Sequence, residues 1–208
     1  KEGIMDIRWL GDSTFIIESK KSTLLTEPSK QIIDENVKAH NLICLYSNES
    51  GKIFQPDNYS ILSGPGEYEA GGVSVKGIPT VGKTLDSSTK SINTFFNVDT
   101  DGLQTAFFGW PSSTFDDLTI KEIGSVDILI ISPSEQLIDS DNILFIIREI
   151  EPKVIILSRY QESGNNQNIL ENLASELGSQ ENASTGKITF TRSNLPDSRQ
   201  VILLDKNN

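Results

Sequence analysis

Three short apolar runs constrain the fold of this chain more than any other feature of its sequence. They span residues 42–45, 128–131 and 154–157, and polar residues follow each of them directly. Continuous apolar runs of this length are typical of strands that are buried on both faces of a sheet. Because open α/β sheets place their sites at the carboxyl ends of such strands, the loops 46–52, 132–135 and 158–162 are the first candidates for a functional site.

The segments between these runs predict further strands and helices. Strands are expected over 6–9, 14–18, 22–26, 59–62, 73–78, 93–98, 104–108, 188–191 and 201–204. Helices are expected over 115–123, 140–150 and 168–177, residues 29–40 are expected to form a loop or short helix, and residues 81–90 a loop.

Two parts of the chain resemble each other locally. Residues 13–16 (Ser-Thr-Phe-Ile) are similar to residues 93–96 (Asn-Thr-Phe-Phe), and the run that begins at Asn41 is similar to the run that begins at Asp127. Similar halves, each with a hairpin followed by a buried strand, predict two sheets that pack face to face and are related by a pseudo-twofold axis.

Length and charge set limits on the class of protein. The 208 residues are expected to form one domain over 1–208, with residues 1–4 as a non-native remnant or an upstream segment before the only methionine, Met5. The formal charge of −11 repels phosphate backbones and anionic lipids, and Lys20-Lys21 is the only adjacent basic pair. Neither a nucleic-acid nor a membrane partner is therefore expected. Because no apolar run is long enough for a signal peptide or a membrane span, the cytoplasm is the expected location.

The chain has one histidine, His40, and one cysteine, Cys44. Zinc sites with several histidines and Ser-His-Asp relays need imidazole groups that this chain does not have. His40 precedes a buried run, so it is expected to be a solvated or hydrogen-bonded loop residue. Cys44 lies inside that run and is expected to be a buried, unreactive thiol.

Eight stretches, taken in order and spacing, resemble the metallo-β-lactamase superfamily. They cover 7–11, 13–15, 26–28, 64–69, 77–80, 126–130, 150–156 and 193–196. The chain is most similar to the small bacterial branch of ascorbate-phosphate-lactonase-like hydrolases. The resemblance implies an α/β (α+β) fold, an αββα sandwich of two mixed β-sheets with helices on both outer faces.

The resemblance also implies histidine and aspartate clusters that hold one or two metal ions, which activate water for hydrolysis. The Gly-His-Ser turn of the family reads Gly11-Asp12-Ser13 here. The His-x-His-x-Asp-His run of the family falls on Ser47, Glu49, Gly51 and Lys52, or, after a one-residue slip, on Tyr46, Asn48, Ser50 and Gly51. The first register is favoured because it matches Asn41 to Asp127.

The other ligand positions of the family fall on Gly82, Trp110 and Arg159. Glycine has no side-chain donor atom, the tryptophan indole offers only an N–H group, and the arginine guanidinium stays protonated. The alignment therefore predicts a degenerate member of the family, without a zinc or iron site and without a cofactor.

If the fold holds, five side chains are expected to approach one another: Asp12, Glu49, Trp110, Arg159 and Lys52. One interpretation is that Arg159 or Lys52 neutralises the carboxylates and Trp110 fills the empty pocket. A second is a small-ligand pocket in which Arg159 binds an anion. A third is a Mg²⁺ or Ca²⁺ ion held by oxygen atoms of Asp12, Glu49, Asp116 or Asp117.

The leading functional hypothesis is a catalytically inactive protein that acts as a structural or interaction module. Its partner would be a protein such as an active relative, or a second copy of the chain. One alternative is a hydrolase that works without zinc or with a hard cation and uses Asp12 or Glu49 as its base. Another is a protein with a small-anion pocket at Arg159.

Overall fold

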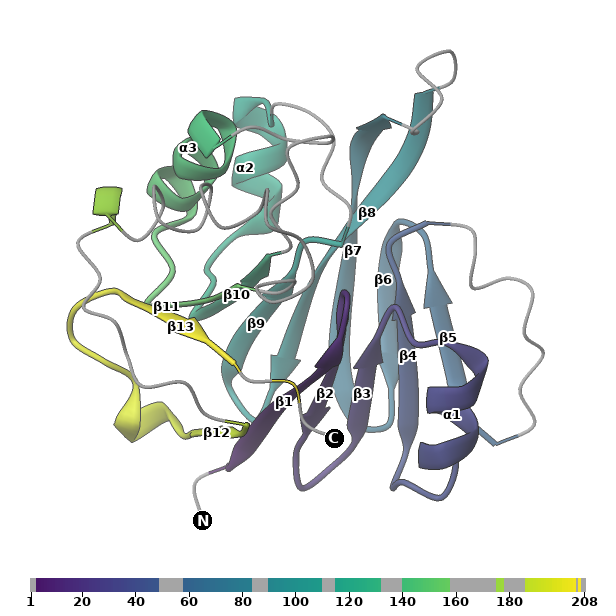
Figure 1. Ribbon diagram of the computed structural model, residues 1–208. Helices are drawn as coiled ribbons and strands as arrows, with labels where there is room; N and C mark the ends of the chain where they lie inside the picture. The colour runs from purple at the N-terminus through teal and green to yellow at the C-terminus, as the bar shows by residue number, and fades with distance from the viewer. Residues whose placement is uncertain are drawn as a thin grey trace.

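A computed structural model describes residues 3–48, 58–83, 90–109, 115–131, 140–157, 175–177, 186–204 and 206. Two mixed β-sheets pack face to face, and helices lie on their outer faces (Figure 1). The six-stranded sheet has the order β12 (Ile188–Phe190), β1 (Met5–Gly11), β2 (Thr14–Glu18), β3 (Thr23–Thr26), β4 (Leu42–Tyr46) and β5 (Ser60–Ser63). The seven-stranded sheet has the order β13 (Gln200–Leu203), β11 (Val154–Leu157), β10 (Ile128–Ile131), β9 (Leu103–Phe107), β8 (Lys90–Thr100), β7 (Val73–Lys83) and β6 (Gly66–Ala70).

The first apolar run was predicted to be buried on both faces of the sheet, and this is confirmed in β4. Ile43 and Leu45 point into the core between the two sheets. The alternate side chains, Leu42 and Cys44, pack on the opposite face against Ile33 of helix α1 (Lys30–Asn36). Since successive side chains of a strand point to opposite faces, a strand between two layers has to be apolar at every position.

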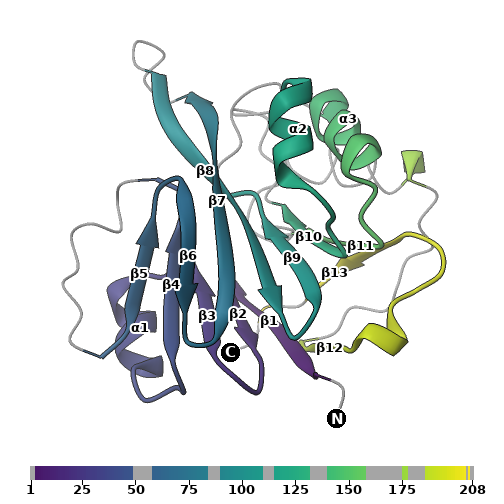
Figure 2. The ribbon, with the colours of Figure 1, turned by 180° about the vertical axis from the view of Figure 1, so that it is seen from behind.

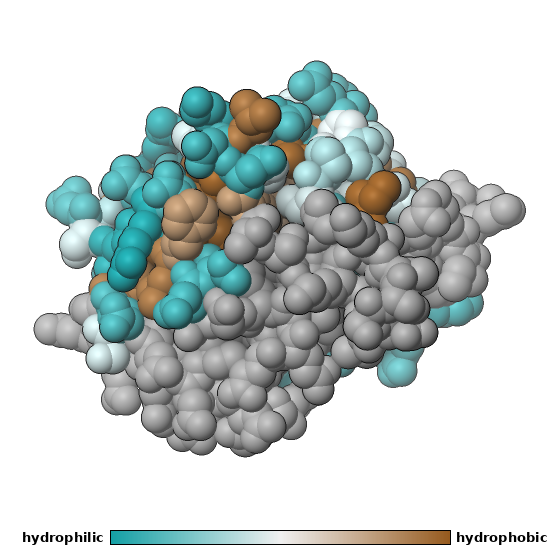
Figure 3. Space-filling view, turned by 90° about the horizontal axis from the view of Figure 1, so that it is seen from above, coloured by the Kyte–Doolittle hydropathy of each residue, from teal (hydrophilic) through white to brown (hydrophobic). Residues whose placement is uncertain are grey.

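Helices α2 (Asp117–Ile123) and α3 (Ser140–Ile150) cover the outer face of the seven-stranded sheet (Figure 1). The predicted apolar stripe of α3 is buried there, with Ile143, Ile146 and Ile147 each 0% exposed. Among the described residues in the view from above, polar side chains are more common, with a few apolar ones between them (Figure 3). Leu118 and Phe145 are the large apolar side chains of α2 and α3 that stay exposed. The predicted αββα sandwich is confirmed.

The two halves of the chain repeat one pairing pattern. In β1–β2–β3–β4–β5 and again in β7–β8–β9–β10–β11, two antiparallel pairs are followed by two parallel pairs. The residues before β4 and β10 also have similar roles. Asn41 Nδ2 donates to the carbonyl oxygen of Lys21 (2.8 Å), and Asp127 Oδ2 accepts from the backbone N–H of Gln104 (2.9 Å). The local sequence similarity therefore corresponds to repeated topology.

The prediction of a loop over residues 81–90 was wrong at both ends. β7 continues to Lys83 and β8 begins at Lys90, and these two residues are paired. Figures 1 and 2 show the resulting hairpin extending beyond the body of the sandwich. Glycine and serine favour loops locally, but cross-strand pairs such as Gly82 with Ser91 hold these residues in strands.

Some predicted segments lie outside the described residues. These include the loops 132–135 and 158–162 and most of the predicted helix 168–177, of which only 175–177 are described. Among the helices of the described ranges, none is long and apolar enough to cross a bilayer.

Candidate functional site

The turn after β1 presents Asp12 at one edge of the sandwich. Gly11 and Asp12 both have positive φ angles, 116° and 49°, so the chain reverses sharply here. The Trp9 indole Nε1 donates to the backbone oxygen of Asp12 (3.0 Å), and the Thr26 hydroxyl donates to that of Ser13 (2.7 Å). The side chain of Asp12 is exposed. The turn thus fixes the backbone of Asp12 and leaves its carboxylate at the surface.

Ser47 follows β4 directly and is completely buried, with 0% exposure. Its backbone N–H donates to Oε1 of Glu27 (2.7 Å), and its carbonyl oxygen accepts from the N–H of Thr94 (2.6 Å). Within the described part of the chain, its hydroxyl has no hydrogen-bond partner. A neutral, enclosed hydroxyl therefore occupies the position where the favoured register expects the first histidine of the family.

Gly109, two residues after β9, lies directly against Ser47. It has a φ of 64°, and a Cβ atom at this position would lie 2.2 Å from Cβ of Ser47. Asn93 is 3% exposed nearby, and its Nδ2 donates to the hydroxyl of Thr80 (2.9 Å) and the carbonyl oxygen of Phe108 (3.3 Å). Around Ser47, Gly109 and Asn93, this part of the site is thus a close-packed network of hydroxyl, amide and backbone groups.

The single histidine lies at the other end of β4. His40 precedes the strand at its amino end, is exposed, and places Nε2 3.1 Å from Nδ2 of Asn41. Cys44 lies in the middle of β4, and burial raises the pKa of its thiol to about 12. Neither side chain lies at the carboxyl edge beside Ser47.

The residues of this chain do not fit the histidine metal site of the family. All of its imidazole and thiol groups are accounted for by His40 and Cys44, both of which are described. In the described part of the chain, no group of three or more His, Cys, Asp or Glu side chains could hold a metal ion. The residues beyond the described ranges can add carboxylates but no imidazole, because the sequence holds no second histidine.

Several predicted site residues lie outside the described ranges: Glu49, Ser50, Gly51, Lys52, Trp110 and Arg159. Their predicted convergence on Asp12 stays a prediction. Gly82 lies in β7 and pairs with Ser91. Tyr46 ends β4, where its hydroxyl donates to the carbonyl oxygen of Pro28 (2.7 Å) and burial raises its pKa.

Asp116, one of the predicted oxygen ligands, is the N-cap of α2. Its Oδ1 accepts from the N–H of Thr119 (2.7 Å), and this hydrogen bond holds the pKa of the carboxyl below its usual value. Asp117 is the acidic residue of the first turn of the same helix. Satisfying the free N–H groups of a helix start is a sufficient role for Asp116.

Asp116→Ala is expected to lower the melting temperature at pH 7 by a few degrees, because the N–H of Thr119 loses its acceptor. Since the folded-state pKa of Asp116 is lowered, its contribution is present above the unfolded-state pKa and is lost as the pH falls through the folded value. The difference between Asp116→Ala and the parent should therefore shrink in acid. Asp117→Asn, which removes a neighbouring charge but no cap, is the control in thermal melts at both pH values. An Asp116→Ala effect no larger than that of Asp117→Asn would contradict the capping role.

Two groups of this site were not predicted from the sequence. Glu27 has a φ of 43° and binds the N–H of Ser47, and Asn93 borders Gly109 from β8. Residues 26–28 were part of the family resemblance, which is the one sequence signal at Glu27. No local pattern pointed to Asn93, because only the packing of β8 and β9 against the end of β4 places it here.

Comparisons with known proteins agree with this architecture. The solved structures found include a candidate Zn-dependent hydrolase of the metallo-β-lactamase superfamily from Thermotoga maritima, with 20% identity, a TM-score of 0.72, and coverage of 96% of this chain and 98% of that one. The metallo-β-lactamase fold protein YhfI from Bacillus subtilis is 9% identical with a TM-score of 0.61, and 98% of each chain is covered. Igni18, a metallo hydrolase from Ignicoccus hospitalis, is 11% identical with a TM-score of 0.61, over 90% of this chain and 98% of that one.

At these identities the solved structures show the fold alone. A search of curated proteins found no match. The model of the family described as "Beta-lactamase superfamily domain" matches residues 6–157, which is more than half of the chain. The chain therefore belongs to the metallo-β-lactamase superfamily.

Proposed function

We propose that this protein is a degenerate member of the superfamily that has lost the histidine metal site and acts as a catalytically inactive interaction module. One observation carries the proposal. Ser47, buried and neutral, directly follows the strand that leads to the ligand loop of the family, while the only histidine lies at the opposite end of that strand.

The chemistry of hydrolysis in this family supports the proposal. A catalytic metal lowers the pKa of bound water and polarises the substrate, and it depends on histidine and carboxylate ligands to stay bound. This chain can offer carboxylates from Asp12 and Glu49, but its one imidazole, that of His40, lies at the other end of β4. A site with so few donors would not hold zinc or iron firmly at neutral pH.

The partner in this proposal is a protein, either an active relative of the same fold or a second copy of the chain. We also propose, from the motif resemblance, that the chain belongs to the ascorbate-phosphate-lactonase-like branch of the superfamily. The similar structures from Thermotoga maritima and Ignicoccus hospitalis are described as hydrolases, and the loss of donors here sets this chain apart from that description.

Elemental analysis of protein purified without a histidine tag and without chelator tests this proposal. We expect less than about 0.1 equivalents of zinc, iron or manganese per chain, because the only imidazole, that of His40, lies away from the proposed ligand positions. A zinc-loaded member of the superfamily, purified and measured in parallel, shows that the procedure retains metal. The proposal would be contradicted by stoichiometric metal together with hydrolysis of a phosphodiester, lactone or lactam that a chelator abolishes.

A second candidate function is hydrolysis with a hard cation or without a metal, with Asp12 or Glu49 as the base. The exposed carboxylate of Asp12, in a turn with a φ of 49°, favours it. Asp12→Asn or Glu49→Gln would then abolish a measurable activity without changing the circular dichroism spectrum. The proposed anion pocket at Arg159 has its own test, a ligand-induced rise in melting temperature that Arg159→Ala removes.

A further inference from the structure

A hollow of ≈ 900 Å³ lies at the amino end of β4, opposite to the end that leads to Ser47. Turns from both sheets line it, with Lys20 and Lys21 between β2 and β3, Gly72 between β6 and β7, and Asp101 between β8 and β9. Figure 1 shows the N-terminus and the β2–β3 turn together at this end of the molecule. The volume is within the range of sites for small molecules, about 300–1,000 Å³.

The chain at Lys21 is held in place from several sides. Its backbone N–H donates to the hydroxyl oxygen of Ser19 (3.2 Å), and its carbonyl oxygen accepts from Nδ2 of Asn41 (2.8 Å). Its Nζ lies 3.2 Å from Oδ1 of Asp101, an ion pair that joins the two sheets. Because these contacts already order Lys21, a ligand that binds it loses less free energy in ordering the site.

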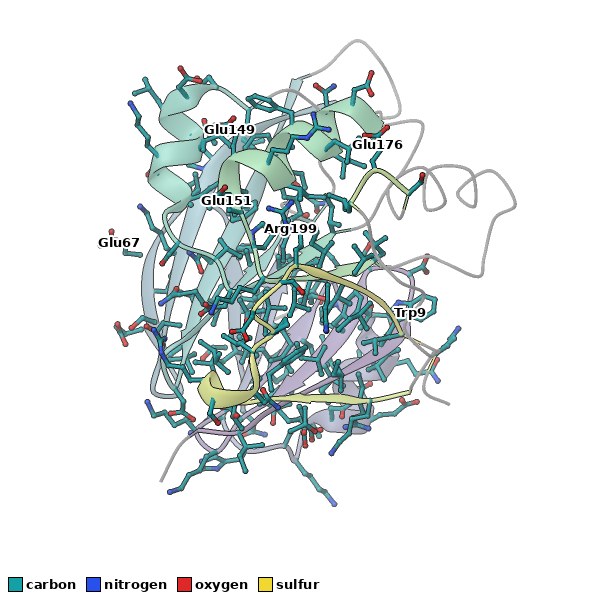
Figure 4. All side chains as sticks on the ribbon, turned by 90° about the vertical axis from the view of Figure 1, so that its left-hand side faces the viewer. Trp9, Glu67, Glu149, Glu151, Glu176 and Arg199 are labelled. Carbon is teal, nitrogen blue, oxygen red and sulfur yellow. The ribbon has the colours of Figure 1, made fainter. Side chains whose placement is uncertain are left out.

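Basic charge exceeds acidic charge in the hollow, although the whole chain has a formal charge of −11. The ammonium groups of Lys20 and Lys21 line it together with one carboxylate, that of Asp101. Lys21 pairs with this carboxylate, and Lys20 has no ion pair within the described ranges. Figure 4 shows Glu149 and Glu176 in the upper half of the molecule, near α3, whereas the β2–β3 turn lies at the lower end. One positive charge is therefore left over in the hollow, which favours an anion.

His40 adds an N–H donor to the lining of the hollow. Nδ2 of Asn41 donates to the carbonyl oxygen of Lys21 and also lies 3.1 Å from Nε2 of His40. Because an amide nitrogen can only donate, Nε2 has to accept, and the ring proton of His40 is then on Nδ1. In the described part of the chain, Nδ1 has no hydrogen-bond partner, so its N–H group can donate to a ligand.

Apolar surface lies beside these donors. Ile4, directly before β1, lines the hollow and is 57% exposed. Gly72 has a φ of 77°, and a Cβ atom there would lie 3.5 Å from Cδ of Lys21, so the aliphatic stem of this lysine packs over the β6–β7 turn. Lysine stems present apolar surface while the ammonium group stays in water. A ligand with an anionic group and an apolar body would match both parts of the lining.

We propose that this hollow binds a small phosphate monoester that has an apolar body. The phosphate would contact the donors of Lys20, Lys21 and His40, and the body would contact Ile4. A phosphate monoester has a charge of about −1.5 to −2 at pH 7, whereas a carboxylate has only one negative charge to offer two ammonium groups. The hollow lies away from the degenerate site at the carboxyl end of β4, so this inference goes beyond the function proposed above.

Titration calorimetry and thermal shift with phenyl phosphate at pH 7.5 test this proposal. We expect saturable binding and a rise in melting temperature. Benzyl alcohol, which has a ring but no charge, should give neither at the same concentration. Inorganic phosphate at equal ionic strength should bind more weakly than phenyl phosphate, because it has no body to contact Ile4.

Lys20→Gln combined with Lys21→Gln should weaken the binding of phenyl phosphate by about tenfold or more, because two charged donors are lost. Lys30→Gln combined with Lys121→Gln is the matched control. It removes the same charge from α1 and α2, and it also takes one lysine with an ion pair, that of Lys30 to Asp34 (2.7 Å), and one that has none within the described ranges. This control should leave the affinity for phenyl phosphate unchanged.

All four lysine side chains are exposed, so both double variants should keep the circular dichroism spectrum of the parent. The proposal would be overturned by an absence of phenyl phosphate binding, by an equal response to benzyl alcohol, or by equal affinities of the two double variants. Inorganic phosphate that binds as tightly as phenyl phosphate would overturn the role of the apolar body. The metal analysis of the proposed function is independent of all these outcomes.

Discussion

Gly109→Ala is expected to lower the free energy of unfolding by about 3 kcal/mol or more, or to prevent folding. The added methyl group would lie 2.2 Å from Cβ and 2.4 Å from Oγ of Ser47, which is far inside contact distance. Ser47 cannot move away easily, since the N–H of Thr94 and Oε1 of Glu27 hold its backbone from both sides. The φ of 64° adds a cost of about 1 kcal/mol for a residue with a side chain. Urea denaturation followed by circular dichroism measures the change.

Gly102→Ala is the matched control, because Gly102 also has a positive φ, 83°, but the nearest atom to an added Cβ is Nη1 of Arg192 at 3.8 Å. We expect it to cost only about 1 kcal/mol. Ser47→Gly in the Gly109→Ala background should recover part of the lost stability by removing the clashing side chain. If Gly109→Ala costs no more than Gly102→Ala, the close contact between the ends of β4 and β9 is wrong.

Asn97→Asp is expected to cost about 3 kcal/mol or more at pH 7.5, while Asn97→Ala should cost about 1–3 kcal/mol. Asn97 donates to two carbonyl oxygens at the end of α2, those of Ile123 and Ser125. Alanine leaves both carbonyl oxygens without this donor. Aspartate does the same and also brings a buried negative charge against them, which is the costlier change.

The pH dependence separates these two variants. Burial and the two facing carbonyl oxygens should raise the folded-state pKa of the new aspartate above its unfolded value of about 3.9. The folded state then binds more protons than the unfolded state, so the stability of Asn97→Asp relative to the parent falls as the pH rises through that window. The deficit should be smaller at pH 4.5 than at pH 7.5, and that of Asn97→Ala should not depend on pH.

Gln200→Glu is the control for the added charge, since Gln200 is exposed on β13. It should change the free energy of unfolding by less than about 0.5 kcal/mol. Equal effects of Asn97→Asp and Gln200→Glu at pH 7.5 would show that Asn97 is not the buried cap of α2. Chemical denaturation of all three variants and the parent at the two pH values gives the comparison.

The candidate site was only partly predictable. The shortage of imidazole groups follows from the sequence, since residue type alone decides how many there are, and the assignment of Ser47 and Asp12 to ligand positions of the family stays a prediction. The enclosure of Ser47 by Gly109 does not, because the two residues lie 62 positions apart and meet only when the two sheets pack. Asp116 shows a limit of the sequence, since a carboxylate that suits a cation also suits a helix start, and only the structure shows that Asp116 caps α2.

The sequence by itself determined the order of the elements and the layers into which they pack. Runs such as 42–45 are apolar at every position because both faces of β4 are covered, and the stripe of α3 is apolar on one side because one side is covered. These patterns are local and periodic, so they can be identified without a structure.

Only the tertiary structure decided which distant residues become neighbours. The extension of the β7–β8 hairpin to Lys83 and Lys90 depends on cross-strand pairing, which overrides local loop preference. The rows that join Glu67 to Asn97 and Glu69 to Asp99 depend on the register of β6, β7 and β8. A shift of one residue would turn every one of these side chains to the other face, so this polar face of the sheet exists only once the register is set.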